Sequence, residues 1–134
     1  MRRSSTALAA ALAGTLMFVG ASCGGGDSGP ELSAEGEKGR EIAGTNGCAA
    51  CHGTNGQGGA GAAWTGLFGS MVELDDGTSV VADEEYIRTS ITDPTAQRNA
   101  GYTLQMPENS LTDDEIDSVI AYIRDLSPEA VGED

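Results

Sequence analysis

Residues 48–52 read Cys-Ala-Ala-Cys-His, and this string holds the only histidine of the 134-residue chain. A Cys-X-X-Cys pair occurs in redox dithiols, in zinc sites and in sites that attach a cofactor covalently. Zinc needs four ligands, usually supplied as two separated pairs. Because the only other cysteine is Cys23, near the N-terminus, and no second histidine exists, the sequence does not favour zinc.

The flanks of this string separate the two remaining possibilities. A dithiol of the thioredoxin type would lie between a strand and a helix, whereas both flanks here, residues 44–47 and 53–56, read Gly-Thr-Asn-Gly, which is typical of loops. A histidine directly after the second cysteine is the signature of c-type haem attachment. We therefore expect one covalent haem c, with Cys48 and Cys51 as thioether anchors and His52 as an axial iron ligand. The expected function is electron transfer.

The sixth position of the iron needs a second ligand from elsewhere in the chain. With one histidine, two imidazole ligands from the same chain are excluded. Met106 is the favoured candidate because it lies between two expected helices, where Pro107 stiffens the backbone. Met71 is the poorer candidate, and we expect it to pack in the core. A thioether favours ferrous iron and raises the reduction potential, which suits a carrier between a quinol-oxidising complex and a terminal oxidase.

Two other functions remain open at this stage. A haem with an open sixth site could act on peroxide or bind a diatomic gas. Cleavage of peroxide would need a catalytic side chain beside the iron, and the nearest candidate is Arg98. We expect Arg98 at the surface or beside a haem propionate instead. A fixed electron-transfer subunit of a respiratory complex is the other alternative. The electron carrier is favoured because a soft sixth ligand closes the site.

The helical patterning predicts an all-α domain with three helical segments and glycine-rich loops. The first segment covers about residues 34–43, the second begins after Asp83 and ends before residues 93–94, and the third follows a capping box at residues 112–115 and ends at residues 127–128. Gly39 offers the close approach that Tyr122 would need if the first and last helices cross. Residues 71–81 could form a small hairpin or an irregular loop, with a turn at Asp75 and Asp76.

The N-terminus reads as an export signal. Residues 1–22 combine Arg2 and Arg3 with an apolar run and small residues, and Cys23 follows directly. This segment resembles a bacterial lipoprotein signal, which implies that Cys23 carries lipid. We expect a flexible tether over residues 23–32, one domain over residues 33–128 and an acidic tail over residues 129–134. The expected location is the outer face of the bacterial cytoplasmic membrane.

The chain is strongly acidic. Its formal net charge is −14, and loss of Arg2 and Arg3 with the signal would make it −16. Such a surface argues against binding nucleic acid or anionic lipid through charge. It suits a monomeric domain that docks onto a basic face of a membrane respiratory complex, or that docks through an apolar haem edge.

The order of motifs over nearly the whole mature domain resembles class I cytochromes c. Residues 48–52, 66–69 (Gly-Leu-Phe-Gly) and 106–107 (Met-Pro) are followed by an amphipathic C-terminal helix. More narrowly, five stretches resemble the cytochrome c domain fused to subunit II of certain bacterial haem-copper oxidases: residues 65–81, 82–87, 93–94, 101–102 and 111–126. The resemblance implies a few helices around one covalent haem c, with His52 and Met106 as axial ligands.

Two departures from that family matter. The transmembrane helices and copper domain of the fused subunit have no counterpart in this sequence, so we expect a free-standing carrier. Ala62 stands where the family usually has proline, and Trp64 where it has leucine. The proline carbonyl commonly accepts the hydrogen bond from the outer nitrogen of the axial histidine. We expect the carbonyl of Ala62 to do so here, and Trp64 and Tyr102 to line the haem pocket.

Overall fold

The computed structural model describes residues 30–127. The expected signal, Cys23, most of the tether and the acidic tail lie outside the described residues. The elements follow in the order α1 (Ala34–Thr45), α2 (Ala49–His52), β1 (Met71–Glu73), β2 (Ser79–Val81), α3 (Glu84–Thr92) and α4 (Asp113–Asp125). In this part of the chain the predicted all-α class is confirmed, with one short hairpin added. Among the described helices, none has the length and apolar character needed to cross a bilayer.

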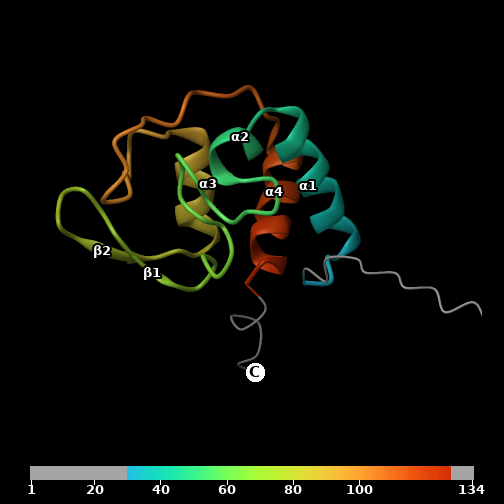
Figure 1. Ribbon diagram of the computed structural model, residues 1–134, viewed down its shortest axis with the longest axis horizontal. Coiled ribbons are helices and arrows are strands. Elements are labelled where there is room, and N and C mark those ends of the chain that lie inside the picture. Colours follow the sequence, from blue (N-terminus) through green and yellow to red (C-terminus); the bar gives the residue numbers. More distant parts are fainter. Residues whose placement is uncertain (1–29, 128–134) are drawn as a thin grey trace, which may run out of the picture.

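Helices α1 and α4 cross in close contact at one side of the molecule (Figure 1). A Cβ added to Gly39 would lie 1.9 Å from the carbonyl oxygen of Ser118 and 2.9 Å from Cβ of Tyr122. Only a glycine therefore allows the two backbones to approach this closely. The predicted contact between Gly39 and Tyr122 is confirmed, and the structure adds Ser118 as the nearest neighbour.

The core lies between α4 on one side and α1, α3, the hairpin and Trp64 on the other. The predicted apolar stripe of α4 is buried, since Ile116, Val119, Ile120 and Ile123 are each 2–3 % exposed. Helix α3 contributes its buried face to the same cluster. The other buried apolar members are Ala43, Trp64, Val72, Leu74, Ala82, Tyr86, Ile87, Ile91, Tyr122 and Leu126.

Each of the three longer helices begins at a side chain that caps its first turn. Ser33 accepts a hydrogen bond from the N–H of Gly36, Asp83 from that of Tyr86, and Thr112 belongs to a full capping box with Glu115. The predicted starts of α3 and α4 are confirmed. Helix α1 ends at Thr45, two residues beyond the predicted end.

The hairpin is fixed by its register and by the loop that follows α3. Met71 pairs with Val81 across the antiparallel strands. The N–H of Ala100 donates to the carbonyl of Glu73 at 2.8 Å, and Asn99 forms an isolated bridge with Leu74. The prediction that Met71 packs in the core is wrong, because its side chain is 65 % exposed. Side chains alternate along a strand, so Val72 points inward and Met71 outward.

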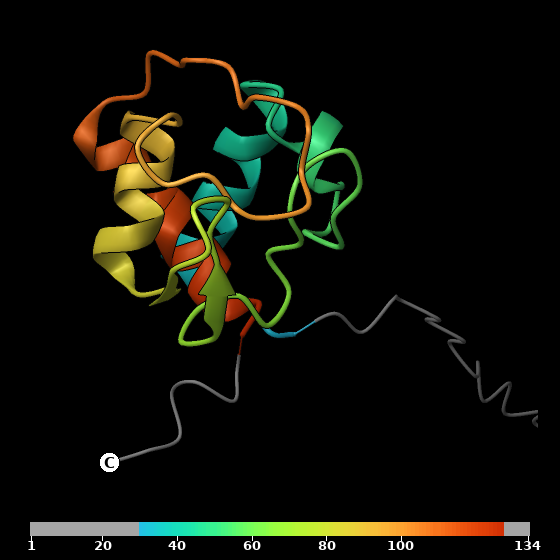
Figure 2. The same cartoon turned by 90° about the vertical axis from the view of Figure 1, so that its left-hand side faces the viewer.

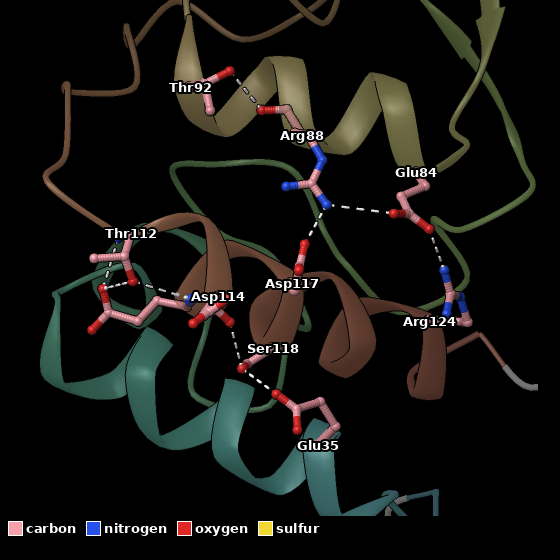
Figure 3. Close-up of polar contacts among 10 residues, drawn as sticks. Glu35, Glu84, Arg88, Thr92, Thr112, Asp114, Asp117, Ser118 and Arg124 are labelled. Carbon is pink, nitrogen blue, oxygen red and sulfur yellow. Dashed lines mark hydrogen bonds and ion pairs between the residues drawn. The ribbon is translucent and has the colours of Figure 1, made fainter.

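Polar contacts tie the helices together outside the core (Figure 3). Arg88 of α3 pairs with Glu84 on its own helix and with Asp117 of α4, and Arg124 of α4 reaches Glu84 at 2.9 Å. Ser118 of α4 donates to Glu35 of α1. The ion pairs are largely exposed, so each contributes about 0–1 kcal/mol and they orient α3 on α4 more than they stabilise the fold.

Residues 101–112, here called the strap, complete the connection from α3 to α4 and run across one end of the molecule, above α3 and α2 in Figure 1 (Figures 1 and 2). Its path is held by side-chain hydrogen bonds to the end of α3. Asn109 donates to the carbonyl of Ile91 at 2.7 Å, and Gln105 donates to that of Pro94 at 2.9 Å. These bonds fix the part of the strap that carries Met106.

Candidate functional site

The two cysteines and the histidine lie on one helical turn. In α2 the N–H of His52 donates to the carbonyl of Cys48 at 3.0 Å, so Cys48, Cys51 and His52 occupy positions i, i+3 and i+4 and share one face. Gly53 ends the turn with φ of +86°, a conformation that favours glycine. A helix of four residues was not predicted, because its flanking glycines and asparagines indicate loops.

Both thiols are free and half-buried. Burial is the main reason that the pKa of the Cys48 thiol is raised above its usual value. Two free thiols on one turn are what covalent attachment of a cofactor requires.

The imidazole of His52 is oriented by a backbone carbonyl. Its Nδ1 lies 2.7 Å from the carbonyl oxygen of Ala62, and since a carbonyl can only accept, Nδ1–H is the donor. The expected hydrogen bond to Ala62 is therefore present without a proline. Burial lowers the pKa of His52 below its usual value, and the bond to Ala62 opposes that shift. The neutral ring keeps the lone pair of Nε2, which is the form that binds metal.

The indole of Trp64 lies against this imidazole. The two ring centroids are 4.6 Å apart with an interplanar angle of 18°, and Trp64 also meets Tyr122 edge-on at 5.9 Å. Trp64 is only 7 % exposed. Its side chain therefore fills the wall behind His52 and restricts rotation of the ring, which is a more specific contact than the sequence predicted.

Two adjoining cavities meet at His52. The first, here named the α3 cavity, is lined mainly by apolar side chains of α3, the loop after it and Trp64. The second, the cysteine cavity, contains Cys48 and Cys51. Five residues line both: His52, Gly61, Leu104, Gln105 and Met106. The two spaces thus form one continuous site between α2 and the strap.

Met106 faces this shared region from the strap. It lines both cavities together with His52 and is half-buried. Leu104 and Gln105 line the same region from its exposed side. They were not identified from the sequence, because the strap has no periodic pattern that shows which residues lie at the cavity. The structure brings Met106 and His52 to the same site although 53 residues separate them.

The remaining candidates lie at the edges of the site or outside it. Tyr102 lines the α3 cavity and is 37 % exposed. Arg98 lines the same cavity and pairs with Asp75 at 3.6 Å. Asp76 accepts hydrogen bonds from Thr78 within the hairpin turn, as a turn residue would. Cys23 belongs to the part of the chain that the structure does not describe.

The site fits a covalently attached haem c. Apolar side chains make up most of the lining of the α3 cavity, with a few polar groups among them, as is usual for cofactor pockets. A Cβ at Gly61 would lie 3.0–3.2 Å from three atoms of the His52 ring, so glycine leaves this face of the imidazole clear. Cys48 and Cys51 would hold the group, and His52 would bind its iron.

Comparison with known protein families places the described residues in one of them. A family model described as "Cytochrome c" matches residues 36–127, which is more than half of the chain and includes every described element except the first two residues of α1. No curated protein matches the chain.

Proposed function

Because the chain belongs to the cytochrome c family, we propose that it is a single-haem electron carrier whose iron is ligated by His52 and Met106. Haem-based electron transfer follows from the family. The axial pair is supported by one observation above all, that His52 and Met106 line the same two cavities from α2 and from the strap. A closed, soft-ligand site is suited to electron transfer and not to binding a substrate at iron.

The protein groups around the haem have distinct tasks. Haem c supplies a metal that changes oxidation state by one electron. Cys48 and Cys51 would hold the cofactor covalently, and His52 and Met106 would bind its iron. Ala62 and Trp64 hold the His52 ring.

Carbon monoxide distinguishes the carrier from a gas sensor or a peroxide-consuming enzyme. We expect the reduced protein to bind carbon monoxide slowly and incompletely, because Met106 occupies the sixth site. Visible spectroscopy of the dithionite-reduced protein measures this. Rapid and complete binding would contradict the carrier and support the open-site alternatives.

The partners we propose are a quinol-oxidising complex as donor and a terminal oxidase as acceptor. Every lysine and arginine within residues 30–127 lies in an ion pair with a carboxylate, so the excess acid dominates the field around this part of the chain. A basic docking face on each partner would complement it. Stopped-flow rates with purified complexes should fall as salt concentration rises, and a rate independent of salt would favour docking through the apolar edge.

Trp64 offers a test of how the axial histidine is held. We expect Trp64→Leu to destabilise the haem-loaded protein by about 2 kcal/mol, since a large buried aromatic side chain is shortened and its stack on His52 is lost. Thermal unfolding measures the loss. Trp64→Phe is the control, because a ring in the same place keeps the contact with the imidazole. Equal stability of Trp64→Leu and the native protein would show that the stack contributes nothing.

The location we propose is the outer face of the bacterial cytoplasmic membrane, with a lipid on Cys23. We expect Cys23→Ala to move the protein from the membrane fraction to the soluble exported fraction, and native protein to carry the mass of a lipid. A high-salt wash of native membranes separates a lipid anchor from electrostatic docking. Retention of Cys23→Ala on membranes, together with co-purification of an oxidase, would support the fixed-subunit alternative instead.

A further inference from the structure

The haem site has two chemically different ends. Of the two haem cavities, Cys48 and Cys51 line the cysteine cavity alone, whereas Gln97, Arg98 and Tyr102 line the α3 cavity alone. Gln97 separates the α3 cavity from an outer groove, which it also lines. The shared region with His52 and Met106 lies between them. In haem the two vinyl groups occupy one side of the porphyrin and the two propionates the other. Attachment of the vinyl side at the cysteines therefore directs the propionates to the end of the site that contains Gln97.

Gln97 carries a polar atom that has no partner. Its Oε1 is buried, and among the described residues it is the one buried side-chain nitrogen or oxygen without a hydrogen bond. Leaving a buried polar group unpaired costs about 1–3 kcal/mol, so such an atom beside a cofactor site indicates a group supplied by the cofactor. Rotation of the terminal amide by 180° exchanges Oε1 and Nε2 without moving the rest of the side chain, and it places a donor at this buried position.

We propose that the side-chain amide of Gln97 binds one haem propionate, with Nε2 donating a hydrogen bond to the carboxylate. The rest of the haem periphery is apolar, so the propionates are its hydrogen-bonding groups at this end of the site. The bond gives the unpaired amide its partner and shields the inner propionate from solvent. Gln97 is thereby a cofactor-binding residue that the sequence motifs do not indicate.

Neighbouring groups are less suited to this inner position. Arg98 is bound to Asp75 at 3.6 Å, and its side chain is 41 % exposed. Tyr102 is 37 % exposed. These two residues lie at the solvent side of the same end and are placed for the outer propionate. The inner carboxylate is left with the neutral amide of Gln97.

Resonance Raman spectroscopy of the haem-loaded protein tests this assignment, because the propionate bending band shifts when a hydrogen bond to the carboxylate is lost. We expect a shift in Gln97→Leu, which keeps the bulk of the side chain and removes the donor. A shift is also expected in Gln97→Glu, whose carboxylate repels the propionate. Thr89→Val is the control, since Thr89 lies with Gln97 along an outer groove and does not line either haem cavity. Its band should match that of the native protein.

A second measurement on the native protein avoids mutation. In the NMR spectrum of the ferrous state, we expect cross-relaxation between the Gln97 side-chain amide protons and the propionate methylene protons. The exposed amide of Gln57 is the internal reference and should give none. Absence of the Gln97 signals, or an unchanged Raman band in Gln97→Leu, would overturn the proposal. The Raman and NMR results do not depend on whether Met106 binds the iron. A failure of the Gln97 proposal can therefore be told apart from a failure of the proposed carrier function, which carbon monoxide tests.

Discussion

Met106→Ala is expected to convert the reduced protein from one that binds carbon monoxide poorly into one that binds it rapidly and stoichiometrically. The alanine side chain has no atom that could ligate iron, so the position opposite His52 becomes open. The reduction potential should fall as well, because a thioether stabilises ferrous iron; axial ligands set haem potentials over a range of about 0.8 V. Optical titration with carbon monoxide and redox potentiometry measure the two effects.

Met71→Ala is the matched control for this prediction. Met71 and Met106 are the two methionines beyond the expected signal, but Met71 is 65 % exposed on the outer face of the hairpin. Its replacement should leave the potential and the carbon monoxide reaction unchanged. If Met71→Ala and not Met106→Ala opened the site, the proposed ligand set would be wrong.

Gly39→Val is expected to give the largest loss of stability among single changes outside the haem ligands. Any Cβ at this position lies 1.9 Å from the carbonyl oxygen of Ser118, which is backbone and cannot rotate away. Helices α1 and α4 must then separate, and overpacking of this kind costs about 3 kcal/mol or more. Chemical denaturation of the haem-loaded protein, followed by far-UV circular dichroism, measures the change.

Gly44→Ala provides the control for helix propensity on the same helix. A Cβ at Gly44 meets nothing within 4 Å, so the substitution adds only the helix-forming tendency of alanine, about 0.5–1 kcal/mol in the stabilising direction. A lower free energy of unfolding for Gly39→Val and a higher one for Gly44→Ala would establish that Gly39 is needed where α1 and α4 cross. A mild effect of Gly39→Val would contradict the close approach.

The starts of α3 and α4 and the cofactor were readable from local sequence because their causes are local. Asp83 and the capping box at Thr112 begin α3 and α4 where predicted, since a cap and its helix are neighbours in the chain. Haem attachment requires Cys48, Cys51 and His52 on one turn. The hairpin was predicted only as one of two alternatives. The prediction that Met71 lies in the core was wrong, because the sequence did not show which face of the strand the rest of the protein would cover.

The properties of the haem site beyond attachment depend on residues that are distant in sequence. The contact of Trp64 with the His52 ring joins a loop to helix α2 across twelve positions of sequence, and the side-chain oxygen of Gln97 is buried without a partner. No pattern of spacing reports such contacts, since they depend on how the strap and the loop after α3 pack over α2. The sequence alone determined that the chain carries a covalent haem and where α3 and α4 begin. Tertiary packing alone decided what surrounds the imidazole and which amide faces the cofactor, because burial and partner geometry exist only once distant segments have met.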